Sequence, residues 1–278
     1  MTSDSILTQN TDLELFFKML EGHTGIAMGI EKEYLLAPRL SKIAQQNGFP
    51  DHFSLIKELV SKSISPLHWT TFEAMATHET MFFRDTYPFQ AIKEVLLPQL
   101  INAKRDSKQL SIWCAAASTG QEPYSMAILL RESFPALSDW DLKIHATDLS
   151  ERALSQAKSG IYSPSEMQRG LTHEQISRHF TRLESGNFQV NSDLRKWIQF
   201  ENINLIKPWQ VTPKSDLILM RNILIYFNQE KKQMVLSKMR DQLSDVGGYL
   251  MLGASESILF DPSFKLHRLE RVSYYSKA

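Results

Sequence analysis

The sequence has little that would support disulfide formation, metal binding or secretion. Cys114 is the only cysteine, which excludes an internal disulfide and a zinc cluster built from cysteines. The eight histidines have no HxxxH or HExxH spacing, so we expect no metal site. The first ten residues, MTSDSILTQN, lack the basic and apolar regions of a signal peptide. These absences favour a reducing, cytoplasmic location.

Long apolar runs and an excess of one charge are missing as well. No stretch approaches the ~18 consecutive apolar residues of a membrane span, so we expect no membrane insertion. Lys plus Arg number 31 and Asp plus Glu number 31, whereas general affinity for nucleic acid needs a basic excess. With 42% hydrophobic residues among 278, the chain is typical of a globular protein with one large domain or two unequal ones.

The N-terminal third has helical periodicity. Apolar residues recur at i, i+4 and i+7, as in Leu36, Leu40 and Ile43, up to about residue 77. A further periodic segment over residues 89–100 contains Pro98, which should kink a helix or cost it a hydrogen bond. We therefore predict an N-terminal helical domain and linker over residues 1–85, followed by a second domain over residues 86–278.

From residue 110 onward, short apolar runs alternate with helical patterns. The expected strands are 110–114, 142–147, 217–220 and 249–252, and the expected helices are 122–134, 150–158 and 229–243. This alternation predicts an α/β fold with a parallel sheet and helices on both faces. The connection 151–215 is too long for a simple crossover, so we predict an inserted subdomain with a β-hairpin at about 172–200, including the alternating segment 197–200. Residues 264–275 fit an antiparallel edge.

Polar and small residues follow the first two expected strands. The run from Ala115 to Gly120 would let a ligand approach the backbone at the carboxyl end of a strand. Asp148 ends the second strand, where a carboxylate can accept both hydroxyls of a ribose. The absence of GxGxxG favours a nucleoside ligand without a pyrophosphate over NAD. A tight turn with no ligand, and a helix N-cap at Asp148, are the competing interpretations.

Arg221 and Asn222 follow the third expected strand, and Tyr226 lies a few residues further on. Because the carboxyl ends of parallel strands meet at one edge, these side chains should face the same crevice as Asp148. Arg84, ahead of the sheet, adds a guanidinium that can pair with a carboxylate of a ligand or substrate. A salt bridge at Arg221 and a packing role for Tyr226 are the alternatives.

Six motifs in register resemble those of the chemotaxis receptor methyltransferases, the CheR family. They are ETMFFRD at 79–85, WCAAASTGQEPYS at 113–125, ATDLS at 146–150, NL at 204–205, RNILIYF at 221–227 and GGYLMLGASES at 247–257. The resemblance implies a Rossmann-like class I methyltransferase sheet that binds S-adenosyl-L-methionine and releases S-adenosyl-L-homocysteine. It also implies methyl ester formation on glutamate side chains of chemoreceptors.

The resemblance implies a set of cofactor contacts. Asp148 would hold the ribose, and Asn204 and Leu205 would lie by the adenine. Glu122 and Arg84 would orient the methionine end of the cofactor. Many relatives have Asn at the position two residues before Thr80, where this chain has His. The full expected set is His78, Thr80, Arg84, Glu122, Asp148, Asn204, Leu205, Arg221 and Asn222.

The reaction that the resemblance implies needs no catalytic base. A glutamate carboxylate is already the nucleophile at neutral pH, and displacement at a sulfonium methyl depends on alignment. We therefore expect no general base and assign Arg84 and Tyr226 to positioning the acceptor. A nearby cation would also keep a buried acceptor glutamate ionised.

The family uses its N-terminal helices against the cytoplasmic helical domain of chemoreceptors. Lys32, Arg39 and Lys42 would fall within about 80° of one another on one helix, either as a docking face or as an ordinary solvated face. Some relatives also bind a C-terminal pentapeptide of the receptor through the inserted hairpin. The corresponding stretch here, 182–188, is short and has one glycine, so we expect the protein to work without the pentapeptide. Separately, we expect it to be a monomer.

Other functions share some of these motifs. The same chemistry on a receptor of a different chemosensory pathway would have all of them. A non-catalytic module that binds S-adenosyl-L-methionine and docks on receptors is the second alternative, although the intact Asp148, Arg221 and Asn222 weigh against a decayed site. A nicotinamide dehydrogenase is disfavoured because GxGxxG and a hydride-site His or Tyr-Lys pair are absent.

Overall fold

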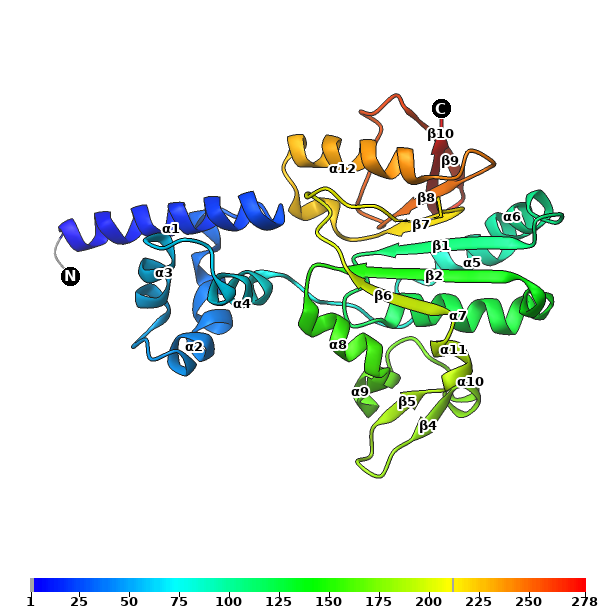
Figure 1. Cartoon of the computed structure of the whole chain (residues 1–278), viewed down its shortest axis with the longest axis horizontal. Helices are drawn as coiled ribbons and strands as arrows, with labels where there is room; N and C mark the ends of the chain where they lie inside the picture. The colour runs from blue at the N-terminus through cyan, green and yellow to red at the C-terminus, as the bar shows by residue number, and fades with distance from the viewer. Residues whose placement is uncertain (1–2, 212) are drawn as a thin grey trace. The chain divides into compact units, whose positions relative to one another are not determined.

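The chain folds into two compact units. The computed structural model describes residues 3–211 and 213–278. One unit comprises the residues up to Thr77 together with Tyr226–Lys232, and the other comprises His78–Ile225 together with Gln233–Ala278. In Figure 1 the helices of the first unit are drawn in blue, and the sheet of the second unit runs from green to red.

The first unit is helical. Its elements are α1 (Ser3–Thr24), the 3-10 helix η1 (Ile30–Leu35), α2 (Leu36–Gln46), α3 (His52–Val60) and α4 (Pro66–Met75). The carboxylate of Asp51 caps α3 by accepting a hydrogen bond from the Ser54 amide at 2.7 Å. Pro66 occupies the first turn of α4, where a proline removes no intrahelical hydrogen bond. The helices bury a shared apolar core that includes Leu13, Phe16, Leu20, Leu36, Leu40, Leu55, Ile56 and Phe72. The helical prediction for this region is confirmed.

The expectation that three basic residues share one helix face is wrong. Lys32 lies in η1, a separate 3-10 helix, whereas Arg39 and Lys42 lie in α2. The Arg39 guanidinium donates hydrogen bonds to the carbonyl oxygen of Met75 and to Thr77 Oγ1. Arg39 therefore satisfies main-chain and side-chain acceptors at the end of α4, a role that helical periodicity alone does not reveal.

The second unit is built on a seven-stranded sheet. In order across the sheet the strands are β6 (Ile198–Asn202), β2 (Asp141–Asp148), β1 (Gln109–Ala115), β7 (Leu217–Met220), β8 (Tyr249–Leu252), β10 (Val272–Lys277) and β9 (Phe264–Leu269). The first five are parallel, and β10 and β9 are antiparallel. The predicted parallel sheet with an antiparallel edge is confirmed. The register sets Ala115 opposite Thr147 and Cys114 opposite Leu219, so the carboxyl ends of β1, β2 and β7 lie level.

Helices follow the strands in the order that the sequence predicts. α7 (Gln121–Ser133) follows β1, α8 (Glu151–Ser159) follows β2, and both pack against β2. α12 (Gln229–Gln242) lies between β7 and β8 in the chain, after the short 3-10 helix η4 (Leu224–Tyr226). A second 3-10 helix, η3 (Pro135–Asp139), leads into β2. Among the residues that the structure describes, no helix is long and apolar enough to cross a membrane.

The segment around Pro98 shows how the fold accommodates a proline within a helical pattern. α5 (Tyr87–Ala91) runs into a π-helical turn, η2 (Ile92–Leu96), and then into α6 (Leu97–Ala103). The Leu97 amide bonds to the carbonyl oxygen of Ile92, five residues back. Pro98 then falls in the first turn of α6, where its missing amide is tolerated. The expected disruption therefore takes the form of a π-helical turn.

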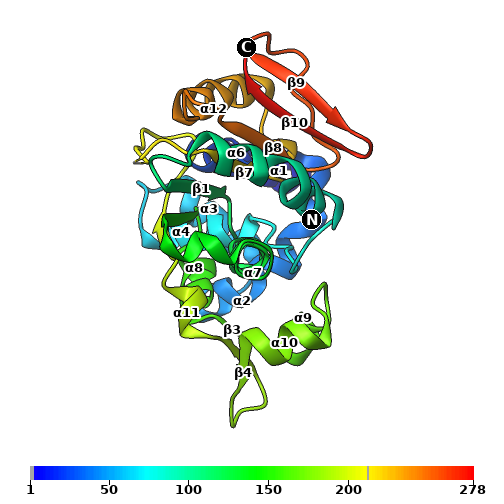
Figure 2. The same ribbon diagram turned by 90° about the vertical axis from the view of Figure 1, so that its right-hand side faces the viewer.

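The connection between β2 and β7 contains a second sheet, called here the small sheet. It consists of β3 (Ile161–Tyr162), β5 (Phe188–Val190) and β4 (Phe180–Arg182), all antiparallel, with α9 (Pro164–Met167), α10 (His173–His179) and α11 (Ser192–Arg195) in the same connection. Figures 1 and 2 show this group beyond the β6 edge of the main sheet.

One segment assigned to the insertion belongs to the main sheet instead. The sequence places residues 197–200 in the inserted subdomain, but Ile198–Asn202 pairs in parallel with β2 as strand β6. Ile198 and Phe200 pack on the core of the second unit, whereas the alternate residues Gln199 and Glu201 are exposed. The alternation therefore reflects a half-covered edge strand of the main sheet.

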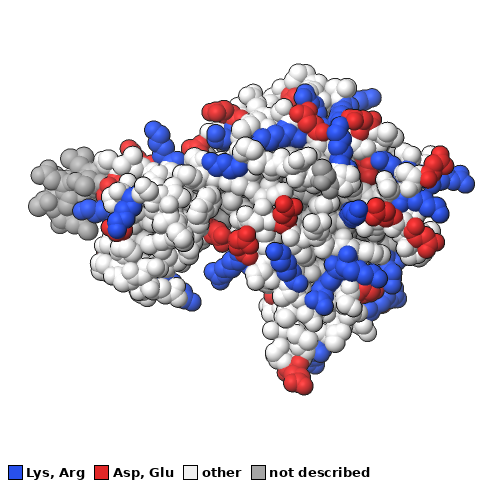
Figure 3. All heavy atoms as spheres, in the orientation of Figure 1, with Lys and Arg blue, Asp and Glu red and all other residues white. Residues whose placement is uncertain are grey.

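Charged side chains of both signs are interspersed on the face of the molecule in Figure 3. Neighbouring opposite charges pair at short range, as between Lys143 and Asp141 at 3.2 Å.

Candidate active site

The turn after β1 has a strained backbone. Ala116 and Ser118 have φ angles of 71° and 51°, and Gly120 has a φ of 97°, all in the left-handed region. The amides of Ala116 and Ala117 both donate to the carbonyl oxygen of Thr147 at 2.8 Å, which ties the turn to the end of β2. Left-handed conformations are costly for non-glycine residues and collect at binding sites. The turn therefore has the character of a ligand-binding loop.

No side chain fits at Gly120. A Cβ there would lie 2.9 Å from Ala157 Cβ and 2.9 Å from the hydroxyl of Tyr162. That hydroxyl donates to the carbonyl oxygen of Thr119 at 2.8 Å. α8 and β3 therefore press against the turn, and glycine at this position lets α7 begin where it does.

Asp148 holds the same turn through its carboxylate. Oδ2 accepts a hydrogen bond from the Ser118 amide at 2.8 Å, and Oδ1 accepts one from the Ser150 amide at 2.9 Å. The N-cap of α8 is Ser150, whose hydroxyl accepts from the Ala153 amide at 3.1 Å. The interpretation of Asp148 as the helix cap is therefore wrong. Its carboxylate lies against the turn after β1, as a ribose-binding group would.

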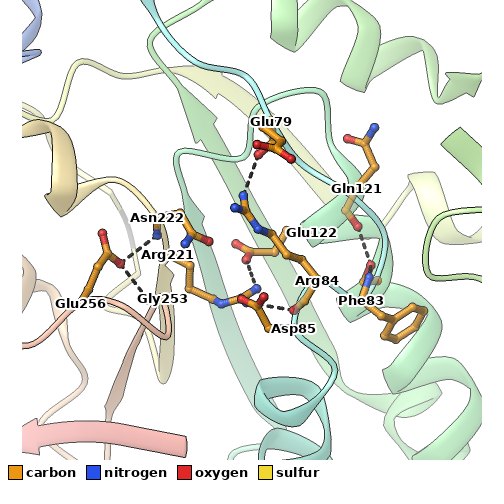
Figure 4. Close-up of polar contacts among 11 residues, drawn as sticks. Glu79, Phe83, Arg84, Asp85, Gln121, Glu122, Arg221, Asn222, Gly253 and Glu256 are labelled. Carbon is orange, nitrogen blue, oxygen red and sulfur yellow. Dashed lines mark hydrogen bonds and ion pairs between the residues drawn. The ribbon is translucent and has the colours of Figure 1, made fainter.

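Arg221 is the centre of a buried charge network (Figure 4). Its side chain is 2% exposed, and Nη1 donates to Glu122 Oε2 at 2.9 Å. Nη2 donates to Asp85 Oδ2 at 2.7 Å and to the carbonyl oxygen of Arg84 at 2.9 Å. The guanidinium also lies 5.7 Å from the ring centre of Phe89. The salt-bridge interpretation of Arg221 is thus correct. The Arg221 side chain links the end of β7 to α7 and to the 79–85 segment.

Glu122 is nearly as buried as its partner, with 13% of its side chain exposed. Burial raises the pKa of this carboxyl, and the charge and hydrogen bond of Arg221 oppose that rise. Arg84 also favours the ionised form, whereas Glu256 disfavours it. A cationic group of a ligand beside Glu122 would add to the effect of the two arginines. The site is therefore suited to a ligand that carries a positive charge.

The 79–85 segment approaches Arg221 through a tightly folded loop. Arg84 Nη1 donates to the carbonyl oxygen of Glu79 at 2.7 Å, which closes the loop. The Phe83 amide donates to Ser125 Oγ on α7 at 2.9 Å. Phe83 and Asp85 have φ angles of 48° and 69°, in the left-handed region. These contacts fix a strained conformation in which the Arg84 carbonyl and the Asp85 carboxylate meet Arg221.

His78 and Thr80 lie at the start of this segment, and both are half-buried. The carbonyl oxygen of His78 accepts a hydrogen bond from Ser118 Oγ at 3.1 Å. His78 therefore reaches the turn after β1 through its main chain. That contact would survive a change of side chain, which fits the departure from Asn at this position.

Asn204 and Leu205 lie in the loop after β6, next to Asp148. The amide of Ile203 donates to the carbonyl oxygen of Asp148 at 3.1 Å. Leu205 is 7% exposed, and its carbonyl oxygen accepts hydrogen bonds from Trp209 Nε1 at 3.0 Å and from Lys238 Nζ at 3.2 Å. The loop thus combines an apolar side chain with a fixed backbone, as a planar base requires.

Glu256 is a site residue that the sequence reasoning missed. Its Oε2 accepts hydrogen bonds from the amides of Asn222 and Gly253, both at 2.8 Å, and Oε1 accepts one from Ile225 at 3.3 Å. Asn222 has a φ of 58°, so the carboxylate holds a strained residue. In the sequence, Glu256 lies three residues after Gly253 within GASES at 253–257. That spacing was the available indication that the Glu256 carboxylate could turn back onto main-chain amides.

Tyr226 belongs to the first unit, whereas Arg84 belongs to the second. Tyr226 is half-buried at the end of η4, and its carbonyl oxygen accepts a hydrogen bond from the Ala27 amide at 2.7 Å. The position is thus anchored through its main chain to the segment after α1.

Most of the expected residues converge at the carboxyl ends of β1, β2 and β7. Asp148 and His78 bond to Ser118 in the turn, and Glu122 and the Arg84 carbonyl bond to Arg221. Among the described side chains, Arg221 Nε is buried without a hydrogen-bond partner. The carboxylates of Asp148 and Glu122 could accept hydrogen bonds from hydroxyl or ammonium groups of a ligand. Within residues 3–211 and 213–278, no group of three or more His, Cys, Asp and Glu is arranged to hold a metal ion.

Comparisons with known proteins extend over most of the chain. Residues 78–272 match a family model described as the CheR methyltransferase, SAM binding domain. A chemotaxis protein methyltransferase of Pseudomonas aeruginosa is 39% identical over 253 residues, or 90% of this chain and 91% of that protein. A chemotaxis protein methyltransferase of Pseudomonas putida is 36% identical over 90% of this chain and 92% of that protein. One of Vibrio parahaemolyticus is 37% identical over 87% of this chain and 88% of that protein. A solved glycopeptide N-methyltransferase with S-adenosyl-L-methionine is 10% identical over 77% of this chain and 69% of that chain, with a TM-score of 0.38.

Proposed function

Because this chain belongs to the CheR methyltransferase family, we propose that it transfers methyl groups from S-adenosyl-L-methionine to glutamate side chains of chemoreceptors. The match to the SAM binding domain makes the chain an S-adenosyl-L-methionine-dependent methyltransferase. The relatives are named for chemotaxis, which supports a chemoreceptor as the acceptor. The observation that carries the proposal is the convergence of Asp148, Glu122 and Arg221 at one edge of the sheet.

The roles proposed for the cofactor-binding residues follow from their chemistry. When bound, S-adenosyl-L-methionine supplies an electrophilic methyl group on a sulfonium. The carboxylate of Asp148 is suited to the ribose hydroxyls, and buried Leu205 beside Asn204 is suited to the adenine. Glu122 would favour the ammonium of the methionine end, and the charge of Arg221 favours the ionised form of Glu122. His78, Thr80, Arg84 and Asn222 complete the proposed contacts.

On the acceptor side, the chemistry asks for positioning only. A glutamate acceptor is ionised at neutral pH, so no group of this chain has to remove a proton from it. The guanidinium of Arg84 can hold a carboxylate through paired hydrogen bonds. Tyr226 is proposed as a second positioning residue, and Tyr226→Phe should lower kcat while leaving affinity for S-adenosyl-L-homocysteine unchanged.

Transfer of radiolabelled methyl groups from S-adenosyl-L-methionine to membranes that contain candidate chemoreceptors tests the proposed function. Mild alkali should release the label as volatile methanol, because glutamate methyl esters hydrolyse readily. Receptors whose methylated glutamates are replaced by alanine provide the matched control and should take up no label.

Each other outcome points to a different function. Label that resists alkali would mean that the acceptor atom is not a carboxylate oxygen. Label on a receptor of another chemosensory pathway, and not on chemotaxis receptors, would mean that the protein catalyses the same reaction on a different receptor. Binding of S-adenosyl-L-homocysteine without any transfer, across a fair panel of receptors, would leave a non-catalytic docking module.

We propose further that this protein does not need a receptor pentapeptide. The β4–β5 hairpin turns over residues 183–187, where the Leu183 amide bonds to the Asn187 carbonyl at 2.8 Å and the Gly186 amide to the Leu183 carbonyl at 2.9 Å. The two bonds leave little free backbone within the turn itself, which supports the proposal. β4 lies at the edge of the small sheet and is the strand to which a peptide could add. Calorimetry with the C-terminal pentapeptides of tethered receptors should give no binding heat, and micromolar binding would contradict the proposal.

The remaining proposals concern the setting of the protein. Receptor glutamates that adapt signalling lie on the cytoplasmic helical domain, so we place this chain in the cytoplasm. We also propose that it acts as a monomer, because one copy of the chain brings Asp148, Glu122 and Arg221 to the same edge of its sheet. Light scattering of the purified protein checks the second statement.

A further inference from the structure

The small sheet holds a residue of the 79–85 segment in an aromatic socket. Phe82 is fully buried. Its ring contacts Tyr162 of β3 edge to face, with centroids 5.1 Å apart, and Phe180 of β4 in the same manner at 5.6 Å. Both partners belong to the small sheet, which no role proposed above uses. Edge-to-face pairs of this kind fix the orientation of a ring as well as its burial.

Gly170, between α9 and α10, lies against the main chain of Phe82. Its φ is 94°, and a Cβ there would lie 1.8 Å from the carbonyl oxygen of Phe82 and 2.7 Å from its carbonyl carbon. No side chain can occupy that position unless the Phe82 main chain moves. Arg169, the preceding residue, adds an exposed ion pair to Glu79 with an N···O distance of 3.7 Å. The connection between β2 and β7 that carries the small sheet is called the insertion from here on. It contacts the backbone of Phe82 as well as its ring.

The position of Phe82 sets the position of the groups that meet Arg221. Phe82 lies inside the loop that the Arg84 guanidinium closes on the Glu79 carbonyl. Two residues after Phe82, the carbonyl oxygen of Arg84 accepts a hydrogen bond from Arg221 at 2.9 Å, and the next residue, Asp85, pairs with Arg221 at 2.7 Å. Because Phe83 and Asp85 are held in left-handed conformations, the turn has little freedom to absorb a shift of Phe82.

We propose that Gly170 and Phe82 are positioning residues of the methyl-transfer site, and that the small sheet serves as its support. In this inference, which rests on the proposed function, the insertion seats Phe82 so that the Arg84 carbonyl and the Asp85 carboxylate hold Arg221. Arg221 in turn pairs with Glu122, the residue proposed to bind the methionine end of the cofactor. The insertion is then needed for cofactor binding even when no receptor is present.

A pair of glycine variants tests this inference. Gly170→Ala forces Phe82 to move, whereas Gly186→Ala is the matched control. Gly186 also has a left-handed φ, of 84°, and lies in the same insertion, but a Cβ there would meet no atom within 4 Å. Both variants carry the backbone cost of alanine at positive φ, and only Gly170→Ala disturbs Phe82. We expect Gly170→Ala to weaken binding of S-adenosyl-L-homocysteine about tenfold or more, and Gly186→Ala to change it less than about twofold.

The measurements separate positioning from stability. Calorimetry gives the affinity for S-adenosyl-L-homocysteine, and the rise in melting temperature at saturating ligand confirms binding to the folded protein. If Gly170→Ala does not fold, Phe82→Leu replaces it, because leucine keeps the socket apolar but loses the edge-to-face contacts; a loss of about threefold to tenfold is expected. Affinity unchanged in the folded variant would overturn the inference.

A second-site variant adds a readout that a purely structural role would not move. Asp85→Asn weakens the contact that Phe82 is proposed to position. In that background Gly170→Ala should cost much less affinity than it costs in the wild-type protein, since the two changes act on one contact. Additive losses would contradict the inference. If the wild-type protein binds S-adenosyl-L-homocysteine but methylates no receptor, the proposed function fails while these affinity measurements still decide the positioning role.

Discussion

The ends of β2 and β7 each present a charged side chain to the same edge of the sheet, but the two are fixed differently. Asp148, at the end of β2, accepts hydrogen bonds from the main-chain amides of Ser118 and Ser150. Arg221, at the end of β7, is held by Glu122, which lies 99 positions away in the sequence, and by Asp85, which lies 136 positions away. The Asp148 carboxylate is thus held by main-chain amides no more than 30 positions away in the sequence. The Arg221 guanidinium is held by carboxylates of segments at least 99 positions away.

The comparison predicts the largest effect at Arg221. Arg221→Ala removes the cation that pairs with both Asp85 and Glu122. The buried Glu122 carboxylate then loses its ion-pair partner. Breaking a buried pair in this way costs about 3–5 kcal/mol of unfolding free energy. Arg221→Lys keeps the charge but not the fork of donors, so it should lose less stability. Urea unfolding of the purified variants measures both.

Arg240→Ala is the matched control for this prediction. Arg240 lies in α12 of the same unit and pairs with Asp241 at 3.0 Å, but both side chains are exposed, by 40% and 69%. Exposed pairs of this kind contribute about 0–1 kcal/mol. Equal losses for the Arg221 and Arg240 variants would mean that the buried network does not carry the stability assigned to it.

The same contrast explains how much the sequence predicts. The strand that ends at Asp148 and the strand that precedes Arg221 follow from short apolar runs, and the parallel arrangement brings their carboxyl ends to one edge. The roles of Glu256 and Arg39 do not follow, because their main-chain partners are identified only once the fold is known. The alternative interpretation of Asp148 as a cap is wrong because Ser150, two residues later, caps α8.

Edge strands show the limit of periodicity. The alternation at 197–200 correctly indicates a strand, but its partner is β2 of the main sheet and not the hairpin of the insertion. Local pattern specifies that one face is covered and leaves open what covers it. The first unit is more predictable, because its helices and their caps are specified by neighbouring residues.

Asp148 should show a comparable loss of stability and a larger specific loss of cofactor affinity. Asp148→Ala removes the acceptors for two buried amides, each of which costs about 1–3 kcal/mol when left unpaired. Asp148→Asn keeps one acceptor oxygen and should retain more of that stability. Because neither variant can accept two ribose hydroxyls as a carboxylate does, both should bind S-adenosyl-L-homocysteine more weakly in calorimetry. If Asp148→Asn matches the wild-type affinity, the ribose role is wrong.

A substitution of Gly253, which follows β8, tests the hydrogen bond from the Asn222 amide to Glu256. We expect a loss of stability of intermediate size. A Cβ at Gly253 would lie 2.8 Å from Asn222 Nδ2 and 2.8 Å from Glu256 Oε2. Gly253→Ala should therefore push the Glu256 carboxylate off the Asn222 amide, at a cost of about 1–3 kcal/mol. Gly22→Ala in α1, where a Cβ would meet no atom within 4 Å, should instead stabilise its helix by about 0.5–1 kcal/mol. Thermal unfolding of the two variants should shift in opposite directions.

The smallest expected effect is a pH dependence that belongs to the β7 end alone. Burial raises the pKa of Glu122 above its ordinary value of 4.5, although Arg221 works against the rise. An acid whose pKa is higher in the folded state than in the unfolded state binds its proton more tightly when folded. Its contribution to stability is therefore present below pH 4.5 and is lost as the pH rises through the folded-state pKa. Glu122→Gln removes this titration, so the unfolding free energy of the wild-type protein relative to the variant should fall as the pH rises above 4.5.

Urea unfolding at a series of pH values between about 4 and 7 measures this difference, which amounts to about 1.4 kcal/mol for each pKa unit of the shift. Glu174→Gln is the matched control, because Glu174 is a carboxylate of the same unit with 75% of its side chain exposed. A relative stability of the wild-type protein that rises with pH would have the opposite sign. It would mean that the attraction of Arg221 outweighs the burial of Glu122, and that the β7 end, like the β2 end, holds a carboxylate whose ionised form stabilises the fold.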